Sequence, residues 1–63
     1  MGMIHVEKFN DLDKMEDRLN EIHEAYNEGR HGEFIVQPEE YILNIDTFAT
    51  DEGWYATVIW RDK

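Results

Sequence analysis

The sequence predicts a small α+β domain with the order strand, helix, strand, strand, in which one helix packs on a mainly antiparallel sheet. Three observations favour this fold class. Apolar and polar residues alternate near both ends of the chain, apolar residues recur at steps of three and four between them, and glycines stand where the helix and the hairpin turn would end. We expect residues 1–63 to form a single domain, without a linker or an internal repeat.

The first strand is predicted over residues 3–9, because side chains alternate there with a period of two. Ile4 and Val6 would lie on one face of this strand, and His5 and Glu7 on the other.

A helix is predicted from about residue 11 to residue 27 or 28, with Asn10 as its N-cap. Gly29 fits the position just after the last helical turn. Arg30 and His31 would then place positive charge near the end of the helix, where the helix dipole favours it.

Residues 41–49 and 54–61 are predicted as two strands of a hairpin, joined by the turn residues 50–53. Alternation in the first of these strands would place Ile42 and Ile45 on opposite faces of the sheet. Before this hairpin, the run Phe34-Ile35-Val36 fits either a strand or a loop, and Pro38 ends that run or confines it to a sheet edge.

Large apolar residues occupy both faces of the predicted hairpin. Trp54 and Trp60 share one face of the last strand, whereas Tyr55 and Ile59 share the other. A single helix covers only one face of a small sheet. The pair that faces away is therefore either partly exposed, as on many small domains, or part of a second surface for self-association or for a partner.

Five acids form one stripe along the predicted helix, within roughly 80° of one another and about 180° from the apolar residues. Like charges at this spacing cost a few tenths of a kcal/mol per pair, so a helix shaped only for stability would place Lys among them. The stripe indicates a docking edge; the alternative is an ordinary solvated helix face. Its members are Asp13, Asp17, Glu21, Glu24 and Glu28, opposite Leu12, Met15, Leu19, Ile22 and Tyr26.

The composition of the chain limits the classes of molecule that it can bind. A net charge of −9 argues against direct binding of nucleic acid or an anionic membrane, and favours a basic protein surface. A hydrophobic content of 41% is too high for a disordered acidic tail. The chain has no cysteine, no secretory signal and no apolar run long enough to span a bilayer, so we expect a cytoplasmic protein without disulfides.

No residue pattern points to catalysis. The chain has neither Ser nor Cys, and Thr47, Thr50 and Thr57 lie in predicted strands or a turn. His5 and His23 belong to no recognised set of metal ligands, and no glycine-rich phosphate loop is present. We therefore expect no enzyme activity, no metal and no cofactor.

The order of elements, the acidic helix ending near Gly29, and the closing segment Gly53-Trp54-Tyr55-Ala56-Thr57-Val58-Ile59-Trp60 resemble small acidic proteins of spore-forming bacteria and their phages. The likeness covers most of the chain and rests on pattern. It implies a small accessory or regulatory factor without catalysis. In size and charge the chain also resembles phage-encoded inhibitors that mimic DNA, such as uracil-DNA glycosylase inhibitors; no site residue is carried over from them.

The resulting hypothesis is a non-catalytic module that binds a basic protein surface, such as that of a nucleic-acid-handling enzyme, by imitating nucleic-acid charge. Its binding residues would be the five acids of the stripe together with Trp54, Tyr55 or Trp60 as aromatic anchors. The alternative is a homo-oligomeric accessory or ligand-binding protein that uses the hairpin aromatics.

Overall fold

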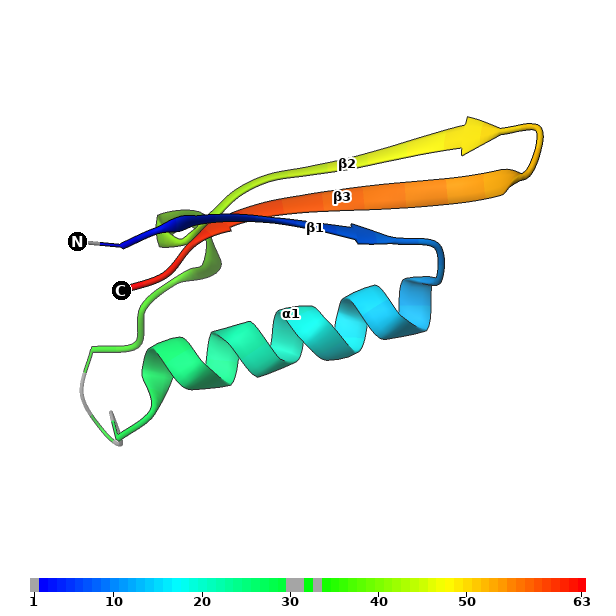
Figure 1. Ribbon diagram of the computed structural model, residues 1–63. Coiled ribbons are helices and arrows are strands. Elements are labelled where there is room, and N and C mark those ends of the chain that lie inside the picture. Colours follow the sequence, from blue (N-terminus) through cyan, green and yellow to red (C-terminus); the bar gives the residue numbers. More distant parts are fainter. Residues whose placement is uncertain (1, 30–31, 33) are drawn as a thin grey trace.

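The computed structural model describes residues 2–29, 32 and 34–63. It confirms the predicted α+β fold, with one helix on a three-stranded antiparallel sheet (Figure 1). In chain order the elements are β1 (Ile4–Phe9), α1 (Leu12–Asn27), a short 3-10 helix η1 (Pro38–Glu40), β2 (Ile42–Thr50) and β3 (Gly53–Arg61).

The strands lie in the order β1-β3-β2, so the last strand of the chain is the central one. Both pairings are antiparallel: Val6 of β1 lies opposite Ile59, and Phe48 of β2 lies opposite Tyr55. The predicted hairpin of β2 and β3 is confirmed. Gly53 has a φ of 138° at the turn, a conformation that side chains with a Cβ rarely adopt.

Helix α1 begins one residue later than the predicted cap implies. Asp11, not Asn10, is the N-cap, and its Oδ1 accepts a hydrogen bond from the Asp13 amide at 2.8 Å. β1 continues to Phe9, and Asn10 forms the bend between strand and helix. At the other end Gly29 has a φ of 77°, as expected after the last turn. Arg30 and His31 lie outside the described residues.

The segment between α1 and β2 is a loop over residues 34–37, and it ends at Pro38, which starts η1. The loop is tied to the helix at Val36. The Val36 amide donates to Asn27 Oδ1 at 2.6 Å, and the Asn27 side-chain amide donates to the Val36 carbonyl at 3.2 Å. These two bonds satisfy both backbone polar groups of Val36 without a strand partner.

The core lies between α1 and one face of the sheet. Tyr26 stacks on Tyr41 with ring centroids 4.2 Å apart, and the Tyr41 hydroxyl is hydrogen-bonded to His23. Burial, with smaller contributions from Tyr26 and Glu39, raises the pKa of Tyr41 above its ordinary value. The buried core residues are Ile22, Tyr26, Tyr41, Ala56, Val58 and Trp60.

A β-bulge at the start of β2 changes the predicted alternation. Ile42 pairs with Trp60 and Ile45 pairs with Val58, with a register shift between Ile42 and Asn44. Because both partners belong to the core side of β3, Ile42 and Ile45 share the helix-facing side of β2. The prediction that they lie on opposite faces was wrong, since one extra residue in a strand reverses every side chain that precedes it.

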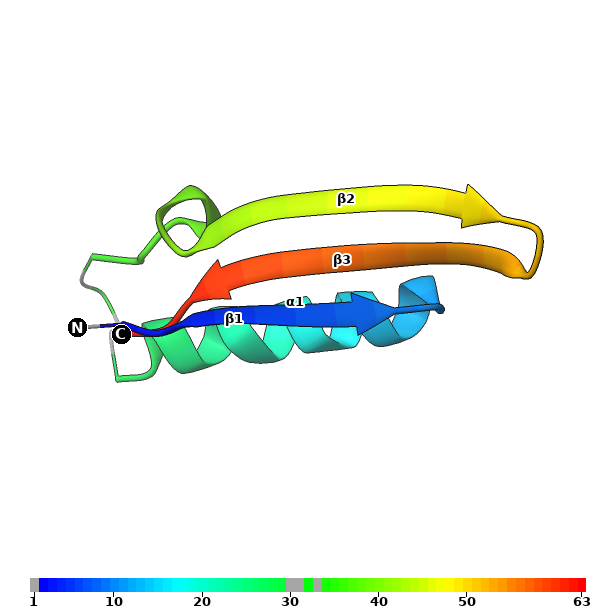
Figure 2. The same cartoon turned by 45° about the horizontal axis from the view of Figure 1, so that its top comes forward.

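The molecule is elongated and flat, with principal extents of 46 × 23 × 14 Å. Helix α1 lies on one side of the sheet, and the tip of the β2–β3 hairpin projects beyond it (Figure 1). Figure 2 shows the three strands side by side, with β2 at the edge farthest from α1 and the two chain ends close together.

Candidate protein-binding surfaces

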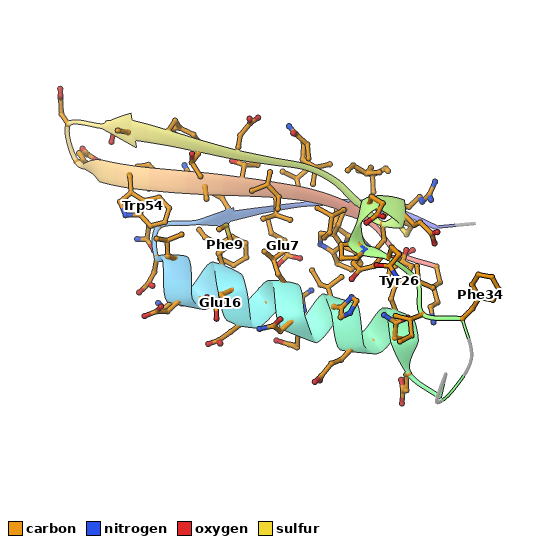
Figure 3. All side chains as sticks on the ribbon, turned by 180° about the vertical axis from the view of Figure 1, so that it is seen from behind. Glu7, Phe9, Glu16, Tyr26, Phe34 and Trp54 are labelled. Carbon is orange, nitrogen blue, oxygen red and sulfur yellow. The ribbon has the colours of Figure 1, made fainter. Side chains whose placement is uncertain are left out.

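The five predicted acids lie on the solvent side of α1, and we call them the acidic face. Every member is exposed. Asp13 to Glu24 lie within the helix, while Glu28 is the C-cap residue just beyond it. In Figure 3, carboxylates project from the side of α1 that faces away from the sheet. The labelled Glu16 is not one of the five acids and lies on the flank of the helix. From Asp13 to Glu28 the acidic face extends over about 22 Å at the helical rise per residue.

One member of the acidic face is paired internally. Arg18 Nη1 lies 3.3 Å from Glu21 Oε1, although the Glu21 side chain is 71% exposed. Asp13, Asp17 and Glu24 form no ion pair with another residue that the structure describes. Most of the charge of the acidic face is therefore open to solvent and to an approaching partner.

Besides its contact with Glu21, Arg18 takes part in a network that joins α1 to β1 and β3. Its Nε donates to both carboxylate oxygens of Glu7, at 2.8 and 3.1 Å, and Trp60 Nε1 donates to Glu7 Oε2 at 2.6 Å. Partial burial alone would raise the pKa of Glu7. The hydrogen bonds from Arg18 and Trp60, together with the positive charge of Arg18, outweigh that burial and lower the pKa of Glu7 below its ordinary value.

The three predicted aromatic anchors lie in three different environments. Trp60 is only 9% exposed and stacks on His5 at 4.4 Å, so in this structure its ring belongs to the core and not to the surface. Trp54 is half-buried on the helix side of the hairpin, close to the start of α1 (Figure 3). Tyr55 is half-buried on the opposite face of the sheet, beside Phe48.

Trp54 borders a depression of about 380 Å³ between the hairpin and the first turn of the helix. Leu12, Thr47 and Ala49 line the same depression, and all three are exposed. Leu12 adjoins Asp13 in the chain but belongs to the opposite side of α1, so this apolar depression lies at the same end of the helix as Asp13 and around the helix from the acidic face.

A second surface is the side of the sheet that α1 does not cover, which we call the open face. The registers place ten residues there away from the hairpin turn: Ile4, Val6, Lys8, Asn44, Asp46, Phe48, Tyr55, Thr57, Ile59 and Arg61. Phe48 stacks on Tyr55 with centroids 5.7 Å apart, and Lys8 Nζ lies 4.6 Å from the centroid of the Tyr55 ring. The open face thus presents aromatic residues near the hairpin turn and aliphatic residues toward its other end, with one polar row across the three strands between them.

Sequence reasoning missed the partners of Glu7 and His5. Both side chains point toward α1, where Glu7 meets Arg18, and His5 Nε2 lies 2.6 Å from Asp62 Oδ2. The hydrogen bond with His5, and a further one from the Met3 amide, lower the pKa of Asp62. The signal was present in the alternation of β1, but the side that the helix covers cannot be read from alternation alone.

Among residues 2–29, 32 and 34–63, no three His, Cys, Asp or Glu side chains gather as a metal site would require. Within the same residues no helix is long and apolar enough to span a bilayer. The Thr50 hydroxyl accepts from the Glu52 amide and donates to the Gly53 carbonyl, so it serves the hairpin turn.

Comparison with known proteins finds no matching protein-family model, no matching curated protein and no matching solved structure.

Proposed function

We propose that this chain is a non-catalytic protein-binding module whose acidic face docks on a basic protein surface that ordinarily holds a nucleic-acid backbone. The observation that carries the proposal is the line of exposed carboxylates on the solvent side of α1, of which only Glu21 is paired with a described cation.

The spacing of the acidic face supports imitation of nucleic-acid charge. One i,i+4 step along a helix rises about 6 Å, a distance comparable to the spacing of phosphates along one strand. A groove lined with Lys and Arg would therefore meet negative charge at a familiar pitch. The net charge of −9 would also speed the encounter with such a groove through electrostatic steering.

Trp54 supplies the apolar component of the proposed contact. Charged contacts on a rim give rate and specificity, whereas affinity comes mainly from buried aromatic anchors. Trp54 lies beside the depression at the start of α1, at the same end of the helix as Asp13. A partner that covers both would bury the exposed part of the indole ring.

The test compares two triple variants that each change the net charge from −9 to −6. The first, Asp17→Asn/Glu24→Gln/Glu28→Gln, neutralises the acidic face. The second, Glu39→Gln/Glu40→Gln/Glu52→Gln, neutralises exposed acids that do not belong to the acidic face. Each immobilised protein is incubated with bacterial lysate, and duplex DNA is then used as a competitor to elute bound basic proteins.

We expect the wild type and the second variant to capture the same basic proteins and release them to DNA. The first variant should capture at least about 10-fold less, since each lost interfacial charge contact costs on the order of 0.5–1 kcal/mol. Circular dichroism confirms that all three proteins are folded. Equal capture by the two triple variants, or capture that duplex DNA does not reverse, would reject the proposal.

A further inference from the structure

The two sides of β1 carry the reverse of the usual polarity. His5 and Glu7 face the helix and are half-buried, whereas Ile4 and Val6 face away from it and are 57% and 65% exposed. Apolar residues of a strand normally point toward whatever covers the sheet. On β1, the open face therefore carries apolar residues typical of a covered face, although no element among the residues that the structure describes covers it.

Charge is distributed unequally between the open face and the rest of the chain. The chain contains 15 acids and 6 bases. The ten described residues of the open face include only one acid, Asp46, and two bases, Lys8 and Arg61. Two copies of this strongly acidic chain would therefore meet with the least repulsion through their open faces.

The isolated chain also exposes more surface than its mass predicts. Its accessible surface is 4970 Å², and a compact monomer of 7.6 kDa would expose about 4,300 Å². Its radius of gyration is 13.2 Å, against about 10.6 Å for a compact chain of this length. The excess area, about 700 Å², is close to the roughly 800 Å² that each partner buries in a specific interface.

We propose that a second copy of this chain covers the open face, so that two sheets pack face to face as a symmetric dimer. The register determines the orientation. Lys8, Thr57 and Asp46 form one row across β1, β3 and β2. A two-fold axis parallel to β3 lays Lys8 of each copy over Asp46 of its partner, whereas an axis perpendicular to the strands would bring Lys8 over Lys8.

The same axis brings Ile59 over Ile59 and Tyr55 over Tyr55 along the central strand. Ile59 and Tyr55 of the central strand then lie in the middle of the interface, and the two Lys8–Asp46 pairs lie at its rim, where charged contacts are usual in protein interfaces. The other apolar residues of the open face, Ile4, Val6 and Phe48, lie on the edge strands beside these pairs. Each acidic face remains on the outside of the sandwich. The dimer is independent of the proposed function, which a monomer would perform equally well.

The test measures self-association by sedimentation equilibrium from about 1 to 300 μM for the wild type, Lys8→Glu, Asp46→Lys and the double variant Lys8→Glu/Asp46→Lys. We expect a concentration-dependent rise to twice 7.6 kDa for the wild type. Each single reversal should raise the dimer dissociation constant at least about 10-fold, because it creates two like-charge pairs. The double variant should return to within about 3-fold of the wild type.

Asp46→Lys separates specific pairing from general repulsion. It lowers the net negative charge, so nonspecific repulsion alone predicts a tighter dimer, whereas the proposed pairing predicts a weaker one. Val6→Lys tests the apolar part of the same face, and it should abolish dimerisation while leaving circular dichroism unchanged. Because Val6 lies on β1, this variant would not disturb pairing through the free edge of β2.

A wild-type chain that remains monomeric to 300 μM would overturn the proposal. Self-association that Val6→Lys does not weaken would also overturn it and would assign the contact to another surface. A dimer that Asp46→Lys strengthens, or that the double variant does not restore, would reject the proposed orientation and with it the proposal.

Discussion

On the side of the sheet covered by α1, β1 contributes His5, Glu7 and Phe9, whereas on the open face it contributes Ile4, Val6 and Lys8. The covered side accepts polar groups because each has a partner: Glu7 binds Arg18 and Trp60, and His5 binds Asp62. The open side keeps apolar groups that no element of the described part of the chain covers. The difference shows that burial within one copy does not account for the whole hydrophobic pattern.

The largest expected difference in stability is between two Val→Ala variants, one on each side of the sheet. Val58, on the covered side, is 1% exposed, and Val6, on the open face, is 65% exposed. Val58→Ala should lower the free energy of unfolding by about 2–3 kcal/mol, from lost transfer energy and a cavity. Val6→Ala should change it by less than about 0.5 kcal/mol at concentrations where the chain is monomeric.

Urea denaturation at about 1 μM measures both variants against the wild type. An equal loss in the free energy of unfolding for the two variants would contradict the difference between the two faces. The open face would then belong to the core of a single copy. At higher concentration, only Val6→Ala should reduce the concentration dependence of unfolding.

A smaller effect is expected from Glu7, the polar group on the covered side. Glu7→Gln should lower the free energy of unfolding at pH 7 by about 1–2 kcal/mol, because the charged hydrogen bond from Arg18 is lost. The pKa of Glu7 is lowered in the folded state from its ordinary 4.5. The stability that ionised Glu7 contributes to the fold is therefore fully present above the ordinary pKa. This contribution is lost as the pH falls from the ordinary pKa through the lower folded-state pKa.

Stability measured from pH 6 down to pH 3 should fall less steeply for Glu7→Gln than for the wild type. Glu16→Gln, on the exposed flank of α1, is the matched control and should keep the wild-type slope. Asp62 also has a lowered pKa, so part of the slope should persist in Glu7→Gln. Identical slopes for the two glutamate variants would show that the Glu7–Arg18–Trp60 network does not stabilise the fold.

The smallest expected effect is a gain in stability on the acidic face. Asp17 lies four residues from both Asp13 and Glu21, and Asp17→Asn removes both repulsions. The free energy of unfolding should rise by about 0.5 kcal/mol at low salt, and the gain should shrink at 1 M NaCl. Thermal unfolding at the two salt concentrations measures it. A loss of stability would mean that Asp17 has a structural partner, and the acidic face would then lose its functional interpretation.

Most of the fold followed from local patterns. Alternation in residues 54–61, the steps of three and four from Leu12 to Tyr26, and the glycines at positions 29 and 53 predicted the hairpin, the helix and their ends. The cap was misplaced by one residue, because Asn10 and Asp11 are equally good caps and only the structure shows that Asn10 forms the bend between β1 and α1. The faces of Ile42 and Ile45 were misassigned, because the bulge depends on pairing with β3.

For the candidate surfaces, the exposure of the acidic face was predictable from helical geometry, since the apolar residues opposite it must face the sheet. The separate environments of Trp54, Tyr55 and Trp60 were not predictable, because alternation pairs residues on a face without saying which face the helix covers.

The sequence by itself determined the helix, the hairpin, the single acidic line and the excess negative charge, because these depend on residues a few positions apart. Only the tertiary structure decided that Trp60 is buried, that Arg18 binds Glu7, and that Ile4, Val6 and Ile59 form an uncovered sheet face with few acids. The physical reason is that the side of the sheet on which α1 packs is fixed by contacts between residues far apart in the chain.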